Sequence, residues 1–146
     1  MEGELDHPLL EQQEVGQDRL VILVHPSHAW ADGRTLRDRD LTLVSWVMRE
    51  QGSGTRSTLE AVLAAAGCDP SALSITMTLP SNEAVLSAVQ AGAGVTALSE
   101  HVAHLALTAG QLAAARFALP ERSFHLLRHR ERYSSRAADA FAAMMV

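Results

Sequence analysis

Apolar residues along this chain occur either in short runs or alternations typical of strands, or at the three- and four-residue spacing of helices. These two patterns follow one another, which predicts strands and helices in alternation. Residues 19–24 and 43–48 are short apolar runs of the kind found in buried strands. Residues 74–79 alternate apolar side chains with serine or threonine, which predicts a half-buried strand. Residues 95–98 form a further short apolar run. We therefore expect four strands in the first hundred residues.

Helical spacing fills the segments between these strands. In residues 55–66 the apolar positions lie on one helix face, and Ser53 is placed to cap the first turn. A second helix is predicted to follow Ser81, its expected cap, and to end at Gly92. Residues 101–107 predict a third, shorter helix. These helices would connect successive strands of one sheet.

The two ends of the chain are less regular than its centre. Residues 1–17 are polar without a clear period, which predicts an irregular lead-in segment, and residues 27–40 predict a loop that could include a helical turn. Residues 111–119 and 123–127 are expected to be strands, and the alanine-rich residues 134–145 a final helix. Strands that alternate with helices predict an α/β fold with a parallel or mixed sheet covered by helices.

Composition suits one domain with a single core, since 47% of the 146 residues are hydrophobic and 20% are charged. The net charge of −5 makes the chain a poor candidate for binding a nucleic-acid backbone, which needs a clustered basic face. Several arginines do gather near the end of the chain, either as a solvated surface or as a binding patch. They are Arg122, Arg128, Arg130, Arg132 and Arg136.

Cysteine usage and the N-terminal sequence bear on the compartment. Cys68 is the only cysteine, so no disulfide can form within the chain, which fits a reducing compartment. The first residues are acidic where a secretory signal would be basic and then apolar. No apolar run approaches the roughly 18 residues of a membrane span. We therefore expect a cytoplasmic protein with no membrane partner.

The clearest local feature is the segment Gly52-Ser53-Gly54-Thr55-Arg56, between a predicted strand and a predicted helix. Glycines let a ligand approach the backbone closely, and the first amides of a helix carry partial positive charge. With the hydroxyls of Ser53 and Thr55, these groups would bind a carboxylate, sulfate or phosphate. The alternative is an ordinary helix cap after a glycine turn.

Pro80-Ser81-Asn82 forms a second junction of the same kind. In open α/β sheets, ligands bind beyond the carboxyl ends of the strands, so the two helix starts could face one cleft. A simple cap is the alternative here too. Arg49, just before the first junction, could pair with a ligand carboxylate, with Glu50 or with Asp40.

Other kinds of chemistry lack a matching pattern. The glycine segment has neither the spacing nor the lysine of a nucleotide-binding loop, and Ser53 does not stand in a nucleophile elbow. The histidine pairs at 25/28, 101/104 and 125/129 have no acidic or cysteine partner at metal-ligand spacing. The sequence therefore predicts no catalytic residue, no metal ion and no cofactor.

Taken in order, four blocks resemble the effector-binding, or substrate-binding, domain of LysR-type transcriptional regulators. Residues 18–29 resemble a family strand with its turn, and residues 49–56 resemble a recognisable block, Arg-Glu-Gln-Gly-Ser-Gly-Thr-Arg. Residues 81–95 resemble a block with Val-x-x-Gly-x-Gly before a strand, and residues 124–141 resemble the last strand and helix. The resemblance covers nearly the whole chain, and its second and third blocks are the specific ones.

This resemblance implies a periplasmic-binding-protein-like fold of type 2, in which a small molecule binds between two α/β lobes. Carried over residue by residue, it places the effector contacts at two junctions of this chain. They are Ser53, Gly54, Thr55, Pro80, Ser81 and Asn82. Family members often carry a hydroxyl or amide where this chain has Pro80, which offers no donor. The implied ligand is an anionic or polar small molecule.

The resemblance also predicts how the chain divides. Residues 18–100 would form lobe two, while residues 1–17 and 101–146 would form the crossover and the returning part of lobe one. The start of lobe one and the DNA-binding winged helix-turn-helix would be absent, so the chain would be an N-terminally truncated sensor. We expect it to self-associate or to be marginally stable, because the returning strand and the final helix would lack their sheet partners and an unpaired apolar edge favours association. Residues 55–66 and 74–79 resemble the family's dimerisation edge.

Three alternatives stay open from the sequence. A solute-binding module of a transporter would share the fold. An enzyme on a similar fold would need a convergent set of acid, base or nucleophile, and none stands out. The segment could also have no function of its own. In the regulator interpretation, the chain would contact DNA only through the absent N-terminal domain.

Overall fold

The computed structural model describes residues 7–131 and 134–145. The chain forms two compact units, which are described separately. The larger unit is Arg19–Pro120, and the smaller unit combines Met1–Asp18 with Glu121–Val146. The candidate site lies in the larger unit.

The sheet of the larger unit is mixed, as the alternation of strands and helices predicts. Strand β2 (Ser45–Arg49) pairs in parallel with β3 (Ser74–Leu79). A parallel bridge from Trp46 to Val95 joins β2 to β4 (Thr96–Ser99). Antiparallel pairing then joins β4 to β1 and β1 to β5. The bounds of these last two strands are Leu10–Val24 and Ala113–Ala115.

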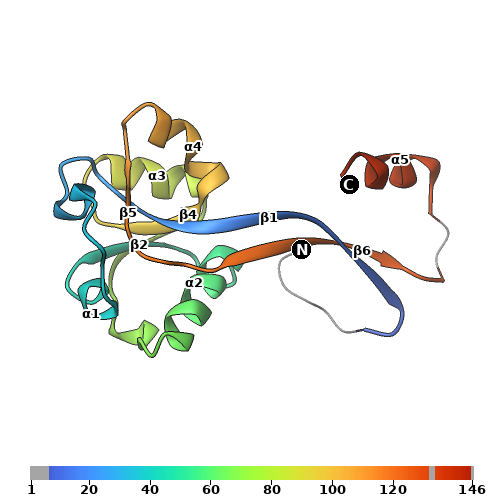
Figure 1. Ribbon diagram of the computed structural model, residues 1–146, viewed down its shortest axis with the longest axis horizontal. Helices are drawn as coiled ribbons and strands as arrows, with labels where there is room; N and C mark the ends of the chain where they lie inside the picture. Colours follow the sequence, from blue (N-terminus) through green and yellow to red (C-terminus); the bar gives the residue numbers. More distant parts are fainter. Residues whose placement is uncertain (1–6, 132–133, 146) are drawn as a thin grey trace. The chain divides into compact units, whose positions relative to one another are not determined.

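Helices cover both faces of this sheet (Figure 1). One side carries α3 (Asn82–Gln90) and α4 (Glu100–Thr108), and the other carries α2 (Gly54–Ala65) and α1 (Asp38–Leu41). A helix follows each of β2, β3 and β4 within a few residues, so three helices begin at the same edge of the sheet. Two short 3-10 helices complete the unit, at Ala29–Asp32 and Pro70–Ala72.

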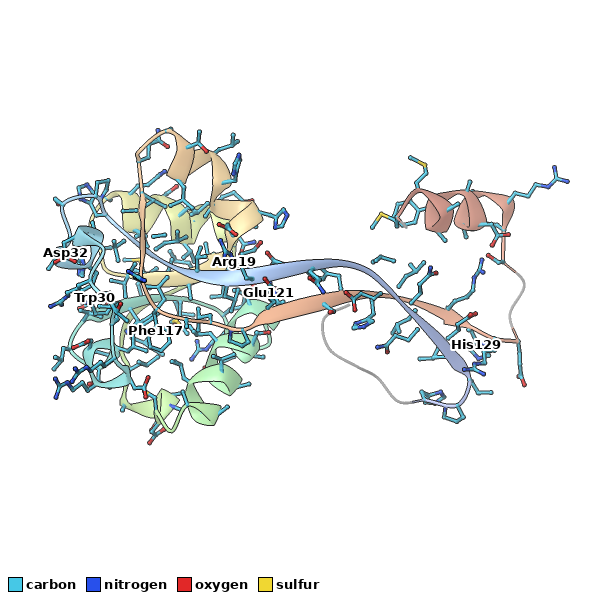
Figure 2. The ribbon with its side chains drawn as sticks, in the orientation of Figure 1. Arg19, Trp30, Asp32, Phe117, Glu121 and His129 are labelled. Carbon is cyan, nitrogen blue, oxygen red and sulfur yellow. The ribbon has the colours of Figure 1, made fainter. Side chains whose placement is uncertain are left out.

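Two hydrophobic clusters fill the faces, because successive residues of a strand point to opposite sides. Trp46 and Met48 join the cluster that contains Leu59 and Leu63 of α2. Val47, between them in sequence, joins the opposite cluster with α3 and α4. Trp30 and Phe117, both labelled in Figure 2, also pack at the α2 cluster. The sheet is therefore buried on both sides, which explains the continuous apolar runs in its central strands.

Gly94 lets β2 and β4 approach each other. Its φ is +156°, a region that other residues rarely adopt, and a side chain there would collide with the backbone carbonyl of Ser45. That carbonyl accepts the Val95 amide at 2.8 Å, and the Val47 amide donates to the Val95 carbonyl at 2.8 Å. The glycine pattern before residue 95 therefore serves close strand packing.

The smaller unit is a two-stranded ribbon with one helix. Strand β6 (Glu121–His129) pairs with β1, and the ion pair between Arg122 and Asp18 joins the two at 2.6 Å. Helix α5 (Arg136–Met144) follows, with the Ser135 hydroxyl accepting the Ala138 amide at 3.1 Å. No residue of α5 is buried. Among its described residues, the smaller unit therefore holds little apolar core.

Three local predictions are wrong. The strand expected over residues 111–119 is limited to Ala113–Ala115. Residues 10–17 belong to strand β1 rather than to an irregular segment; in this ribbon most of their side chains are exposed, so no apolar alternation develops. Strand β3 is exposed rather than half-buried, with Ile75 37% and Met77 40% exposed, because it stands at the edge of its sheet.

The larger unit continues past residue 100 to Pro120. Residues 101–120 group with the larger unit, since α4 packs on the sheet through Ala103 and Ala106 and β5 pairs with β1. A sequence pattern does not reveal this grouping, because it depends on which strand a short alanine segment joins. That the larger unit corresponds to lobe two, and the smaller one to part of lobe one, stays a prediction.

Candidate functional site

Three helix starts meet at the edge where the parallel strands β3, β2 and β4 end. The carboxyl ends of parallel strands lie at one edge of a sheet, which is where open α/β folds bind ligands. Each of the three helices has a serine at its N-cap: Ser53 before α2, Ser81 before α3 and Ser99 before α4. The sequence alone treats such serines alike, but of these three only Ser81 makes a side-chain capping hydrogen bond in the structure.

Ser53 stands at the N-cap of α2, but its side chain does not cap the helix. It is 8% exposed, and its side chain makes no capping hydrogen bond, although its carbonyl accepts the Ser57 amide at 2.9 Å. Gly52 precedes it with φ +89°, a turn that favours glycine. The first amides of a helix have no partner inside the helix. At α2 these amides and the Ser53 hydroxyl are therefore left to interact with a ligand or with water.

Ser81 does cap its helix. Its hydroxyl accepts the Ala84 amide at 3.1 Å, and its carbonyl accepts the Val85 amide at 3.1 Å. The side chain of Ser81 is therefore committed to the first turn of α3, as the capping alternative predicts. Pro80, the residue before it, has no N–H to offer.

Arg49 connects the two junctions. It is the last residue of β2 and stands opposite Leu79 at the end of β3. Its guanidinium donates to the side-chain oxygen of Asn82, the first residue of α3. It also donates twice to Glu50, from Nε at 2.8 Å and from Nη2 at 2.9 Å. The pairing with Glu50 predicted as one alternative is present, while the bond to Asn82 was not foreseen.

The Arg49–Glu50 pair keeps both groups charged near neutral pH. The hydrogen bond to Glu50 raises the pKa of Arg49, and the negative charges of Glu50 and Glu83 act in the same direction. In return, the hydrogen bond from Arg49 lowers the pKa of Glu50. A carboxylate that accepts two hydrogen bonds from one guanidinium is a geometrically specific pair.

Arg56 stabilises the junction between β2 and α2 through hydrogen bonds to both elements. It is 9% exposed, and its Nε donates to Glu60 one helical turn later at 2.7 Å. Its Nη1 donates to the Arg49 backbone carbonyl at 3.0 Å. The side chain thus fixes the first turn of α2 against the end of β2. Sequence reasoning assigned Arg56 no role beyond the block itself; its i, i+4 spacing to Glu60 is a signal for the ion pair alone.

Of the six predicted contact residues, three lie at the start of α2 and three at the start of α3. Arg49 and Asn82 join the two groups. Ser53, Gly54 and Thr55 present the open helix start, whereas Ser81 is engaged as a cap and Pro80 offers no donor. The role of all six in effector binding stays a prediction.

No group of three or more His, Cys, Asp or Glu in residues 7–131 and 134–145 has the arrangement of a metal site. Within the same ranges, no helix is long and apolar enough to cross a membrane. The histidines at 25 and 28 instead serve local turns, with their Nδ1 atoms accepting the amides of Ser27 and Trp30, both at 3.1 Å.

Comparison with known proteins gives a consistent result. The family model described as the LysR substrate binding domain matches residues 1–146. An uncharacterized HTH-type transcriptional regulator, MJ0300 of Methanocaldococcus jannaschii, is 37% identical over 108 residues, which are 74% of this chain and 36% of that protein. The chain spans about a third of the length of the first curated relatives it matches.

Solved structures agree on the fold. The regulatory domain of CcmR from Synechocystis PCC6803, in complex with 2-PG, matches with a TM-score of 0.86 at 22% identity, over 99% of this chain and 69% of that one. The effector binding domain of QuiR, in complex with shikimate, matches with a TM-score of 0.78 at 19% identity, over 96% and 65%. The fold is thus that of LysR effector-binding domains, of the periplasmic-binding-protein-like type. The chain belongs to the LysR substrate binding domain family.

Proposed function

We propose that this chain is the small-molecule sensing part of a transcriptional regulator, and that its effector binds where α2 and α3 begin. The observation that carries the proposal is the open start of α2. Ser53 leaves its own hydroxyl and the first helix amides uncapped, and Arg49, at the end of the strand before this junction, holds the side chain of Asn82 at the start of α3. Such a helix start favours hydrogen-bond acceptor oxygens, and negative charge above all.

The comparisons support this function. The family is defined by substrate binding, and the CcmR and QuiR domains carry 2-PG and shikimate in their structures. MJ0300 is named as a transcriptional regulator, which favours a sensor over the solute-binding module of a transporter. In the proposed mechanism, the effector changes the geometry of an oligomer, and a DNA-binding domain outside this sequence responds.

Self-association is the second part of the proposal, and its surface is the edge of β3 with α2. In the described chain β3 pairs with β2 on one side only, and its residues Ile75 and Met77 are exposed. An exposed apolar edge strand is a template for pairing with another chain. The corresponding test is Met77→Lys, which should reduce the dimer fraction measured by light scattering across a concentration series. A monomer at every concentration would contradict this part.

The test of the binding site is a thermal-shift screen of small carboxylates and sulfate, followed by titration calorimetry of the strongest compound. Ser53→Ala and Thr55→Val should each weaken binding about tenfold, since a hydrogen bond to a charged group contributes about 1.5 kcal/mol. Ser57→Ala, on the exposed face of the same helix, is the matched control and should leave the affinity unchanged. A compound that binds both site variants as tightly as the original chain would refute the site.

A further inference from the structure

At the sheet edge where α2, α3 and α4 begin, arginine side chains are paired with glutamate side chains. Three arginines stand there, and each is already paired with a glutamate. Arg49 pairs with Glu50, Arg56 with Glu60, and Arg19 of β1 (Figure 2) with Glu100 at the start of α4. The last pair has two hydrogen bonds, at 2.6 and 2.8 Å. These cations therefore already have a bound anion each.

Glu83 adds one more negative charge. It lies in the first turn of α3, directly after Asn82, whose side chain accepts a hydrogen bond from Arg49. The negative charge of Glu83 also contributes to the raised pKa of Arg49. Among the described residues named here, three arginines against four glutamates leave a net charge of −1. The positive potential that remains comes from helix starts, each equivalent to about half an elementary charge.

Glu50 has the central place in this balance. Its two oxygens accept from Nε and Nη2 of Arg49, the fork of the guanidinium that matches the oxygens of a phosphate or carboxylate. The Glu50 side chain is 41% exposed, so it covers this fork from the solvent side rather than from the core. Asn82 accepts from Arg49 through its oxygen, which leaves the NH₂ group of its amide as a donor.

We infer that this edge selects effectors with at most one negative charge, such as monocarboxylates rich in hydroxyl groups, and that Glu50 is the residue that sets this selection. The inference rests on the proposed function and specifies the ligand class of the same site. Open helix amides and the Ser53 hydroxyl stabilise one carboxylate. A phosphate ester carries close to two negative charges at neutral pH and meets a net negative surface. Without the Glu50 carboxylate, Nε and Nη2 of Arg49 could donate their hydrogen bonds to such a dianion instead.

The experiment compares two minimal probes of equal size class, acetate and methyl phosphate, on the full 146-residue chain at pH 7.5 and constant ionic strength. Amide chemical shifts of Gly54, Thr55 and Arg56 report binding, and two-dimensional NMR measures dissociation constants even in the millimolar range. Acetate should bind the original chain more tightly than methyl phosphate. In Glu50→Gln, methyl phosphate should gain about tenfold in affinity relative to acetate, because one charge of like sign is removed from its surroundings.

Two variants separate charge from folding. Glu50→Asp keeps the carboxylate and should keep the preference for acetate. Glu11→Gln removes the same formal charge from the exposed side of β1 in the smaller unit and should leave the ratio of the two constants unchanged. A purely structural effect of Glu50 would change both constants together and leave their ratio unaltered.

The experiment distinguishes failure of the selection by Glu50 from failure of the proposed effector site. If methyl phosphate binds the original chain more tightly than acetate, or if Glu50→Gln leaves the ratio unchanged, the selection by Glu50 is overturned while the site stands. If neither probe shifts the amides at the start of α2, the proposed effector site itself is refuted, and the selection with it.

Discussion

The starts of α2 and α3 look alike in sequence and act differently in structure. Both follow a parallel strand, and both have a serine at the N-cap. Ser81, with φ −143° and ψ 157°, folds its hydroxyl onto the Ala84 amide, whereas Ser53, with φ −66° and ψ 128°, does not reach its own helix. The hydroxyl of Ser81 thus stabilises the start of α3, whereas the hydroxyl of Ser53 and the first amides of α2 stay available to a ligand.

The turn before each serine accounts for the difference. Ser53 follows Gly52 in a left-handed conformation, and its amide is held by the Glu50 carbonyl at 3.2 Å. Ser81 follows Pro80, which enters the helix from an extended strand without a glycine turn. With the tight turn before α2, the Ser53 side chain does not cap the helix, and the first amides of α2 stay open after the end of β2 at Arg49.

The largest expected effect comes from breaking the sheet that holds the two helix starts side by side. Gly94→Ala should destabilise the chain by about 3 kcal/mol, because its side chain meets the Ser45 carbonyl and separates β2 from β4. Gly92→Ala is the matched control: it has a positive φ but open space, so about 1 kcal/mol of strain is expected. Urea denaturation measures both. Equal losses would show that the close approach at Gly94 contributes nothing.

The next effect concerns the support beneath the α2 start. Arg56→Leu should cost about 2 kcal/mol, since it removes charge-assisted hydrogen bonds to Glu60 and to the Arg49 carbonyl from a nearly buried position. The same variant should weaken effector binding, because the open amides of α2 lose their fixed place. Chemical denaturation and calorimetry check the two parts. Unchanged stability would contradict the supporting role of Arg56.

Serine-to-alanine exchanges separate the two helix starts most clearly in stability. Ser81→Ala should lower the free energy of unfolding by about 1 kcal/mol, the usual contribution of a capping side chain. Ser53→Ala should change it by no more than a few tenths, because there is no capping bond to lose. Thermal or urea denaturation of the two variants decides the matter, and a loss in Ser53→Ala as large as in Ser81→Ala would count against the comparison.

The smallest effect is the pH dependence introduced by Glu50. The hydrogen bond from Arg49 lowers the pKa of this carboxyl in the folded chain, so the unfolded chain binds its proton more readily. Its contribution to stability is therefore present above the unfolded pKa of about 4.3 and is lost as the pH falls through the folded value. Glu50→Gln should show a shallower loss of stability below pH 4.5 in acid titrations. Identical slopes would exclude this contribution.

Sequence patterns predicted most elements of the larger unit, because strands buried on both faces and amphipathic helices leave strong periodic signals. They failed for residues 10–17, where a ribbon exposed on most positions has no apolar period, and for the exposure of β3, which depends on its place at the sheet edge. Hydrophobic periodicity describes which residues are apolar, not which strand lies next to which.

The candidate site was predictable as two segments, but not as one arrangement. Ser53 and Ser81 are equivalent N-cap candidates in the sequence, and only the backbone before each decides whether its hydroxyl folds back. The bond from Arg49 to Asn82 spans 33 positions and requires the register of β2 against β3. The burial of Arg56 likewise follows from packing rather than from any local pattern.

The most direct measurement of the account is an acetate titration of the original chain, followed by the backbone amide shifts at both helix starts. The amides of Thr55 and Arg56 should shift and saturate together, whereas the Ala84 amide, already bound by Ser81, should stay unchanged. Shifts at Ala84 as large as those at Thr55, or none at Thr55 and Arg56, would contradict the claim that the first amides of α2 bind the ligand while the Ala84 amide of α3 is held by Ser81.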